Sequence, residues 1–304
     1  YTDIYLRSRI AQATVRKLSS RFSAPVLNRI AGRFDHSLDS HVVSHFPILG
    51  IWSHIATRRA KSSGDLTRVF VRKGTEFCRR VRKDDYKEID AIYAFSSAAL
   101  EIFEWARANN IVCVLDHATA PRLYEDRLVR EECDRFPGWE IPPVEDENVR
   151  AYAQRQREEW DLADVILCGS EFVVKAIQME GGPTEKAVVV PLGIRQSLFP
   201  AQARSASRIK SDALRVLFVG DDALRKGLVE LRDAIAKLDS ERFIARVVGN
   251  LSLTDYGRSE ACRTLHLVGP IPRSRMTEQH EWADVLVLPS LSDTFALVVL
   301  EAMA

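Results

Sequence analysis

The segment LRVLFVGDDALRKGLVELRDAIAKL, residues 214–238, has the pattern of one strand, one turn and one helix. A continuous apolar run ends at Gly220, and a helical pattern follows from about residue 225. Strands that are apolar on both faces are typical of parallel sheets covered by helices. This segment therefore predicts an α/β fold.

The same alternation repeats along much of the chain. Strands are expected at residues 89–95, 111–116, 164–169, 186–191, 214–220, 242–249, 263–269 and 284–289. Helices are expected at about 97–109, 145–162, 170–180, 225–238, 273–282 and 295–304, and two basic helices near 3–22 and 64–82. Repeated βα units of this kind predict parallel sheets. The basic helices are interpreted as solvated faces, with a membrane surface or another anionic partner as the alternative.

A chain of 304 residues is long enough for two domains. The stretch 191–214 is rich in Pro, Ser, Ala and Arg and lacks apolar periodicity, so we place the boundary there, with domains at 1–195 and 196–304. Two doubly wound domains facing across a cleft would bind a ligand at the carboxyl ends of their strands. The chain has no initiating Met and ends inside a helical pattern, so we expect material beyond both termini and an incomplete second domain.

Composition narrows the classes of function. The 43 Lys and Arg against 42 Asp and Glu leave a net charge of +1, which does not favour a nucleic-acid partner. The five cysteines are scattered without a CxxC pair, which favours a reducing cytoplasm. His41 and His45 have the spacing of a zinc helix, but Val42 stands where a zinc protease needs Glu, so no metal site is predicted.

The C-terminal segment LPSLSDTFALVVLEAMA, residues 288–304, predicts a phosphate site. A strand ends at Leu288, and Asp293 precedes a helix expected from about Phe295, whose free N–H groups suit a diphosphate. Glu301 lies eight positions after Asp293, on about the same side of the helix. The alternative is that Asp293 only caps the helix and Glu301 is a surface acid.

The turn at residues 220–227 points to the same chemistry. Gly220 allows a tight turn at the strand end, and Lys226 at the expected helix start would place an ammonium beside oriented N–H groups. The alternative is a solvated pair, Arg225 and Lys226. The turn matches neither GxGxxG nor GxxxxGK[ST], so a dinucleotide dehydrogenase and a P-loop NTPase are both disfavoured.

Together these residues resemble the retaining nucleotide-sugar glycosyltransferases of the GT-B fold, the glycosyl transferases group 1 with a Glu-x7-Glu motif. The motifs FVGDDALRKG, HLVGPIPRSRM, ADVLVLPS and SDTFALVVLEAMA follow in the expected order. The N-terminal half matches more loosely, and residues 1–85 show no clear match.

The resemblance implies roles for particular residues. Lys226 would hold the donor pyrophosphate, with Arg225 as a second cation, and Glu301 would bind the ribose. Asp293 stands where the family has its first Glu, which contacts the sugar hydroxyls. His117 matches a position near the sugar; its alternative is a satisfied histidine at a strand end. The backbone N–H groups of Phe295, Ala296 and Leu297 would receive the β-phosphate, and Val268, Gly269 and Pro270 would line the base.

The resemblance also implies an activity: transfer of a hexose-type sugar from a UDP or GDP donor to an acceptor hydroxyl, with retention and without a metal or further cofactor. Saccharide, lipid-linked and small-molecule acceptors stay open. The expected location is the cytoplasm, with peripheral contact at the inner membrane face as an option. The alternatives are a nucleotide-sugar epimerase or hydrolase on the same fold, and a catalytically silent nucleotide-sugar-binding subunit.

Overall fold

The computed structural model describes residues 46–81, 89–194, 213–238 and 242–304. The basic helix expected near 3–22, His41, His45 and the predicted domain boundary at 195/196 lie outside these ranges. By their contacts the residues group into two compact units, one of Tyr1–Leu115 with Asp146–Asp164, and one of Asp116–Glu145 with Val165–Ala304.

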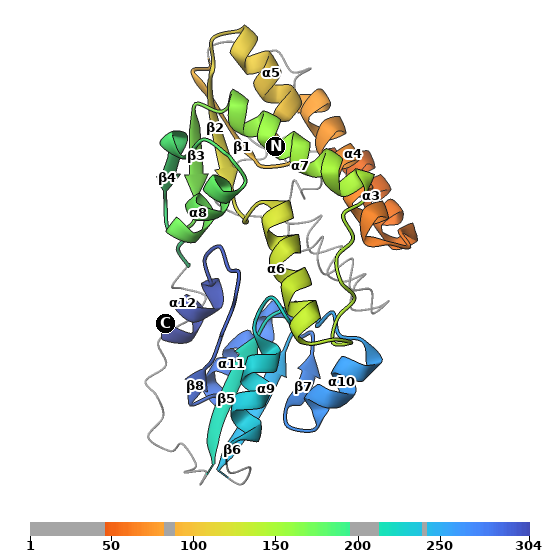
Figure 1. Cartoon of the computed structure of the whole chain (residues 1–304). Coiled ribbons are helices and arrows are strands. Elements are labelled where there is room, and N and C mark those ends of the chain that lie inside the picture. The colour runs from red at the N-terminus through yellow and green to blue at the C-terminus, as the bar shows by residue number, and fades with distance from the viewer. Residues whose placement is uncertain (1–45, 82–88, 195–212, 239–241) are drawn as a thin grey trace, which may run out of the picture. The chain divides into compact units, whose positions relative to one another are not determined.

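The first unit is mainly helical (Figure 1). Its elements are α3 (Pro47–Arg59), α4 (Ser63–Val81), β1 (Ala91–Phe95), α5 (Leu100–Ala108), α7 (Glu147–Leu162) and most of β2 (Val112–His117). Helix α4 packs against α3, α5 and α7. It confirms the basic helix expected at 64–82, and one of its arginines, Arg72, lies 4.9 Å from the ring centre of Trp52 on α3.

The second unit holds the remaining strands. Its helical elements are α6 (Arg122–Arg135), α8 (Glu171–Met179), the short η1 (Thr184–Lys186), α9 (Leu228–Ala236), α10 (Asp255–Cys262), η3 (Arg273–Arg275), α11 (Met276–Trp282) and α12 (Leu297–Met303). Its strands are β3 (Val165–Cys168), β4 (Ala187–Val189), β5 (Leu214–Val219), β6 (Phe243–Val248), β7 (His266–Gly269) and β8 (Val285–Leu286). All eight predicted strands are present, which confirms the α/β class.

The described strands form two four-stranded sheets, of order β1-β2-β3-β4 and β7-β6-β5-β8. Strand β5 pairs in parallel with β6, Leu214 opposite Phe243, and with β8, Val216 opposite Val285. Strands β6 and β7 are also parallel, and so are β3 and β4. The pairings confirm the parallel sheets expected from the continuous apolar strands.

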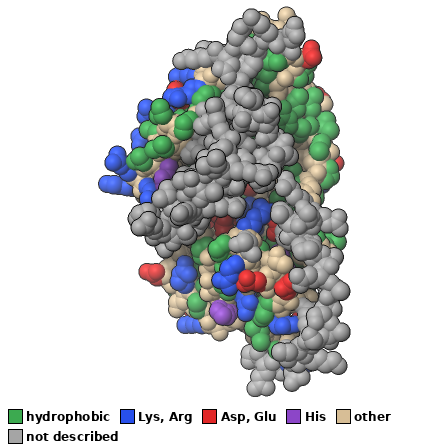
Figure 2. All heavy atoms as spheres, turned by 180° about the vertical axis from the view of Figure 1, so that it is seen from behind, with side chains coloured by type: hydrophobic (Ala, Val, Ile, Leu, Met, Phe, Trp, Pro, Cys, Tyr) green, Lys and Arg blue, Asp and Glu red, His purple; other side chains and the backbone are tan. Residues whose placement is uncertain are grey.

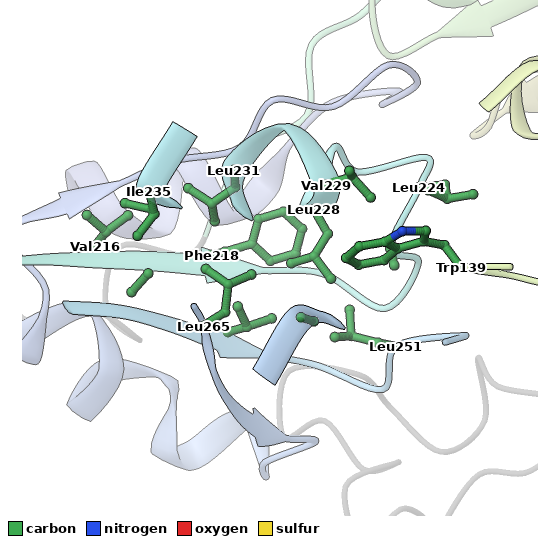
Figure 3. Close-up of a cluster of buried hydrophobic side chains, with 14 of the residues drawn as sticks. Trp139, Val216, Phe218, Leu224, Leu228, Val229, Leu231, Ile235, Leu251 and Leu265 are labelled. Atoms are coloured by element: carbon green, nitrogen blue, oxygen red, sulfur yellow. The ribbon is translucent and has the colours of Figure 1, made fainter. Parts of the chain in front are cut away.

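The β5–β8 sheet is buried on both faces. On one face Val216 and Phe218 pack with Leu228 and Leu231 of α9 in a cluster that also contains Trp139 (Figure 3). On the other face Leu217 packs with Val248 and with Met276 of α11. Alternate residues of β5 thus enter different cores, which explains why the strand has no polar face.

Three helices of the described ranges were not predicted: α3, α6 and α10. Helix α6 has no apolar stripe in its sequence, because its buried side chains include Asp126 and Glu132.

On the face in Figure 2, the visible blue and red side chains are intermixed in the lower part of the view, in line with the near-zero net charge. None of the described helices is long and apolar enough to cross a membrane.

Candidate functional site

The order of the second sheet brings two turns together. Strand β5 lies between β6 and β8. After β5 the chain continues to β6 and β7 on one side of it, and it then returns to form β8 on the other side. In doubly wound sheets, ligands bind at such a reversal, beyond the carboxyl ends of the strands. The turn 220–227 follows β5 and the segment 287–296 follows β8, and the backbone N–H of Leu291 donates to the carbonyl of Arg225 at 3.0 Å.

Glycines shape the turn after β5. Gly227 has φ +74°, and a Cβ there would lie 2.1 Å from the carbonyl oxygen of Pro289. Only glycine fits both the left-handed conformation and this close approach. A Cβ on Gly220 would lie 3.2 Å from Cγ of Lys226, so Gly220 leaves room for the lysine stem.

The helix after this turn is confirmed, but it begins three residues later than the expected start at about residue 225. Helix α9 begins at Leu228 with Gly227 as its N-cap, not at residue 225, because the left-handed Gly227 separates the turn from the helix. Lys226 therefore lies in the turn before the helix. Its side chain is 13% exposed, and its Nζ donates to Oδ2 of Asp293 at 2.5 Å.

The start of the last helix also differs from the expectation. Helix α12 begins at Leu297 with Ala296 as its N-cap, and no side chain caps it. The alternative that Asp293 caps this helix is thus wrong. Of the three N–H groups expected to receive a phosphate, Phe295 and Ala296 precede the helix and Leu297 is its first residue.

Arg225 is held by its own neighbours. Its guanidinium bonds to Asp222, donates to the carbonyl of Ser292 at 3.0 Å and lies 3.6 Å from Glu125. Ser292 also donates through Oγ to Glu125 at 3.0 Å. Burial raises the pKa of Glu125, while Arg225 and the bond from Ser292 act in the opposite direction. Arg225 therefore ties the two turns together.

Glu301 lies on α12 with two basic neighbours. Its Oε1 accepts from Arg273 at 2.9 Å, and its Oε2 lies 3.9 Å from Nε2 of His280. Burial lowers the pKa of His280, against the effect of Glu301. The carboxyl is 11% exposed and held by the connection after β7, so it is not an isolated surface acid.

The three residues expected to line the base lie at the end of β7 and just after it. Val268 is 37% exposed, and Gly269 has φ +82° and accepts from the N–H of Gly249 at 3.1 Å. Pro270 follows directly and leads toward Arg273. This segment thus joins the partner of Glu301 to the sheet.

His117 ends β2 and is fully buried. Its Nδ1 lies 2.7 Å from the carbonyl oxygen of Thr119, and a carbonyl only accepts, so the neutral ring carries its proton on Nδ1. Burial lowers its pKa to about 4. The ring is therefore neutral at pH 7, and a role near the sugar stays a prediction.

Sequence reasoning missed several members of the site. These are Asp222, Glu125, Arg273 and Ser292, together with Glu140, which accepts from the backbone N–H groups of Ala223 and Leu224 in the turn. Asp222 stands three positions before Arg225, a spacing that could have signalled the pair. Glu125 and Glu140 are far in sequence from the turn 220–227, and no local sequence pattern predicts their contacts with it. Among the described residues, no group of three or more His, Cys, Asp or Glu side chains could hold a metal ion.

Comparison with known proteins relates part of the chain to a described family. Residues 201–304, which include Lys226, Asp293 and Glu301, match the family described as "Glycosyl transferases group 1". The chain is 33% identical over 149 residues to a D-inositol 3-phosphate glycosyltransferase of Kineococcus radiotolerans, covering 42% of this chain and 34% of the relative. A protein of the same name from Streptomyces scabiei is 31% identical over 147 residues, covering 41% and 32%. The aligned part therefore spans about a third of these curated relatives.

Solved structures agree on the fold. Starch Synthase IV from Arabidopsis thaliana, bound to ADP and acarbose, has a TM-score of 0.54 at 13% identity, covering 80% of this chain and 60% of that one. Anabaena HepE, in complex with UDP and glucose, has a TM-score of 0.52 at 16% identity, covering 76% and 60%. The chain thus has the α/β architecture of GT-B glycosyltransferases, with parallel sheets.

Proposed function

We propose that the protein transfers a hexose-type sugar from a nucleotide diphosphate donor of UDP or GDP type to an acceptor hydroxyl, with retention of configuration. The observation that carries this proposal is the meeting of Lys226 and Asp293 at the reversal point of the β5–β8 sheet, within the segment that matches the glycosyltransferase family. Retention follows from the resemblance to the Glu-x7-Glu enzymes, in which Asp293 takes the place of the first Glu.

Charge development explains the role given to Lys226. Cleavage of the donor leaves negative charge on the departing diphosphate, and a fixed cation in a partly buried site stabilises that charge. Lys226 is 13% exposed and lies in a turn fixed by Gly227, so its ammonium is held before the reaction begins. The side chain supplies the charge itself, and we therefore propose transfer without a metal or a further cofactor.

Asp293 and Glu301 would orient the two ends of the donor. When the donor binds, its diphosphate would accept the hydrogen bond that Lys226 now donates to Asp293. The carboxylate of Asp293 would then accept hydrogen bonds from the sugar hydroxyls. Glu301 would accept from the ribose hydroxyls while Arg273 keeps the carboxylate in place. His117 keeps its predicted role near the sugar, and with its proton on Nδ1 the Nε2 atom is the acceptor of the ring.

The acceptor is a saccharide, a lipid-linked or a small molecule. The relatives' printed names include D-inositol 3-phosphate, which makes a phosphorylated cyclitol a sensible first acceptor to assay. All five cysteines are free in the structure, which supports a reducing cytoplasm as the location. We also propose that the basic helix α4 makes peripheral contact with the inner membrane face.

Product analysis tests the proposal. The full-length protein is incubated with UDP-glucose or GDP-mannose, with and without acceptors, and the sugar products are separated. Transfer to the acceptor that survives a chelator and is lost in Lys226→Ala but kept in Lys237→Ala supports it; Lys237 is exposed at the end of α9. Free sugar without acceptor dependence would mean a hydrolase, an isomerised donor would mean an epimerase, and binding without turnover would mean a silent subunit.

A further inference from the structure

A second stretch of chain supports the turn that carries Lys226. Helix α6 and the loop after it, residues 122–145, belong to the same compact unit as the β5–β8 sheet. Trp139 from this loop is 3% exposed and lies in the core beside Phe218 and Leu228 (Figure 3). The loop is therefore part of the core that underlies the site.

Polar contacts fix the loop around Trp139. The carbonyl of Trp139 accepts from the N–H of Thr254 at 2.9 Å, and a Cβ on Gly257 would lie 2.6 Å from the same oxygen. The guanidinium of Arg232 lies 4.9 Å from the centre of the indole ring. These contacts hold both the backbone carbonyl and the ring of Trp139, so the position of the next residue, Glu140, is also restricted.

Glu140 reaches from this anchored loop into the turn. Its Oε1 accepts from the backbone N–H groups of Ala223 at 2.7 Å and of Leu224 at 3.1 Å. Glu140 is 8% exposed, and Ala223 and Leu224 are fully buried. Two buried N–H groups therefore depend on one carboxylate 83 positions away in the chain.

These two N–H groups lie just before the proposed phosphate cation. The carbonyl of Leu224 accepts from the N–H of Gly227 at 3.0 Å, and that of Ala223 accepts from Leu228 at 2.9 Å. Ala223 and Leu224, whose N–H groups bond to Glu140, thus also accept hydrogen bonds from the two residues at the end of the turn. Lys226 lies in the chain between these two pairs of residues. The path of the backbone through Lys226 follows from where Glu140 fixes residues 223 and 224.

We propose that Glu140 is a positioning residue of the nucleotide-diphosphate site, which aims Lys226 by holding the backbone N–H groups of Ala223 and Leu224. This inference rests on the proposed function. The core anchors the loop through Trp139, whereas the carboxylate of Glu140 bonds to the turn, so its loss should affect the turn more than the rest of the fold.

The experiment compares the wild type with Glu140→Ala, Glu140→Gln and Glu131→Gln; Glu131 is an exposed acid on α6. Affinities for UDP, GDP and uridine are measured by calorimetry, and amide hydrogen exchange is followed in the peptide 220–227. Thermal unfolding checks that each variant is folded.

In Glu140→Ala we expect faster exchange in the peptide 220–227 and at least about 10-fold weaker binding of the diphosphate, since small displacements of a positioned group are costly. Uridine affinity should stay within about 2-fold, because uridine has no phosphate for Lys226 to hold. Glu140→Gln should restore part of the affinity, because its amide oxygen still accepts, and Glu131→Gln should match the wild type.

Unchanged exchange and diphosphate affinity in Glu140→Ala would overturn the inference while leaving the proposed function intact. If Glu140→Ala does not fold, Glu140→Gln decides, and an affinity equal to that of the wild type overturns the inference. Equal losses for uridine and UDP would show a general structural role and also overturn it. If the wild type binds neither UDP nor GDP, the proposed function fails, and the inference fails with it.

Discussion

Lys226 and Asp293 are 67 positions apart in the sequence, yet Nζ of the first lies 2.5 Å from Oδ2 of the second. The side chains are 13% and 23% exposed, so the pair is partly shielded from water. Each residue comes from a turn beyond the carboxyl end of a strand, β5 for Lys226 and β8 for Asp293. Asp293 is thus the present counter-ion of the cation that we assign to the donor diphosphate.

The first prediction concerns this pairing. In Asp293→Asn the shape is kept and the negative charge beside Lys226 is removed, so diphosphate no longer competes with a carboxylate. We expect UDP or GDP to bind about 3- to 10-fold more tightly, and we expect sugar transfer to fall, because the proposed function assigns Asp293 to the sugar hydroxyls. Titration calorimetry and a transfer assay measure the two effects. Weaker nucleotide binding would show instead that the pair is needed to hold Lys226.

The second prediction concerns Gly227. Gly227→Ala adds a Cβ 2.1 Å from the carbonyl oxygen of Pro289 at a φ of +74°. We expect it to lower the free energy of unfolding by at least about 2 kcal/mol, since the left-handed conformation and the clash both oppose alanine.

Gly181→Ala is the matched control. Gly181 has φ +75° and nothing within 4 Å of a new Cβ, so only the conformational cost of about 1 kcal/mol remains. Urea unfolding of both variants gives the comparison. Equal losses would show that the approach to Pro289 is not a constraint.

The third prediction concerns a buried ionic network in the first unit. Arg155 donates to both carboxylate oxygens of Glu101 at 2.8 and 2.6 Å and lies 3.4 Å from the fully buried Glu159. Glu159 in turn accepts from the N–H groups of Ser97, Ala99 and Leu100, at the start of α5. Arg155→Ala leaves Glu159 without its positive neighbour and should cost about 3–5 kcal/mol of stability.

The exposed pair of Arg107 and Asp164 is the comparison for this network. Its side chains are 50% and 35% exposed, so Arg107→Ala should cost less than about 1 kcal/mol. Similar losses in the two variants would argue against the buried network as a special source of stability. Denaturant unfolding of the full chain supplies both values.

The fourth prediction is a dependence on pH. Burial lowers the pKa of His117 from 6.5 to about 4. Between pH 6.5 and about pH 4 the histidine therefore binds a proton in the unfolded chain but not in the folded chain. The free energy of unfolding should therefore fall as pH drops from 6.5 toward 4, by roughly 3 kcal/mol from this group, and its contribution should level off below pH 4.

His117→Gln removes this titration, so its stability should change less between pH 6.5 and 4 than that of the wild type. His54→Gln, at an exposed position, is the control and should keep the wild-type slope. Urea unfolding at several pH values measures the slopes. The same slope in His117→Gln and in the wild type would contradict the assignment of the proton to His117.

Strands were easier to predict than helix ends and unpatterned helices. Continuous apolar runs such as 214–219 identify strands buried on both faces, and all eight are present. Helix α9 begins three residues later than predicted because the positive φ of Gly227 depends on the approach of Pro289, which is distant in sequence. Helix α10 has a glycine inside and only eight residues, so its periodicity is weak.

The candidate site was only partly readable from the sequence. Lys226, Asp293 and Glu301 belong to local motifs, and the structure joins the first two directly. The partners that hold them come from elsewhere: Arg273 for Glu301, and Glu140 for the turn of Lys226. Tertiary packing decides such contacts, because Glu140 follows the buried Trp139 in the chain and bonds to a turn that is 83 positions away.

Equilibrium binding of UDP and GDP to the full-length protein tests the central claim most directly, with Lys226→Ala, Glu301→Ala and the control Lys237→Ala measured beside it. The account predicts micromolar binding of one nucleotide, lost in the first two variants and kept in the third. Binding of neither nucleotide by a demonstrably folded protein would contradict it, and so would binding that survives both substitutions.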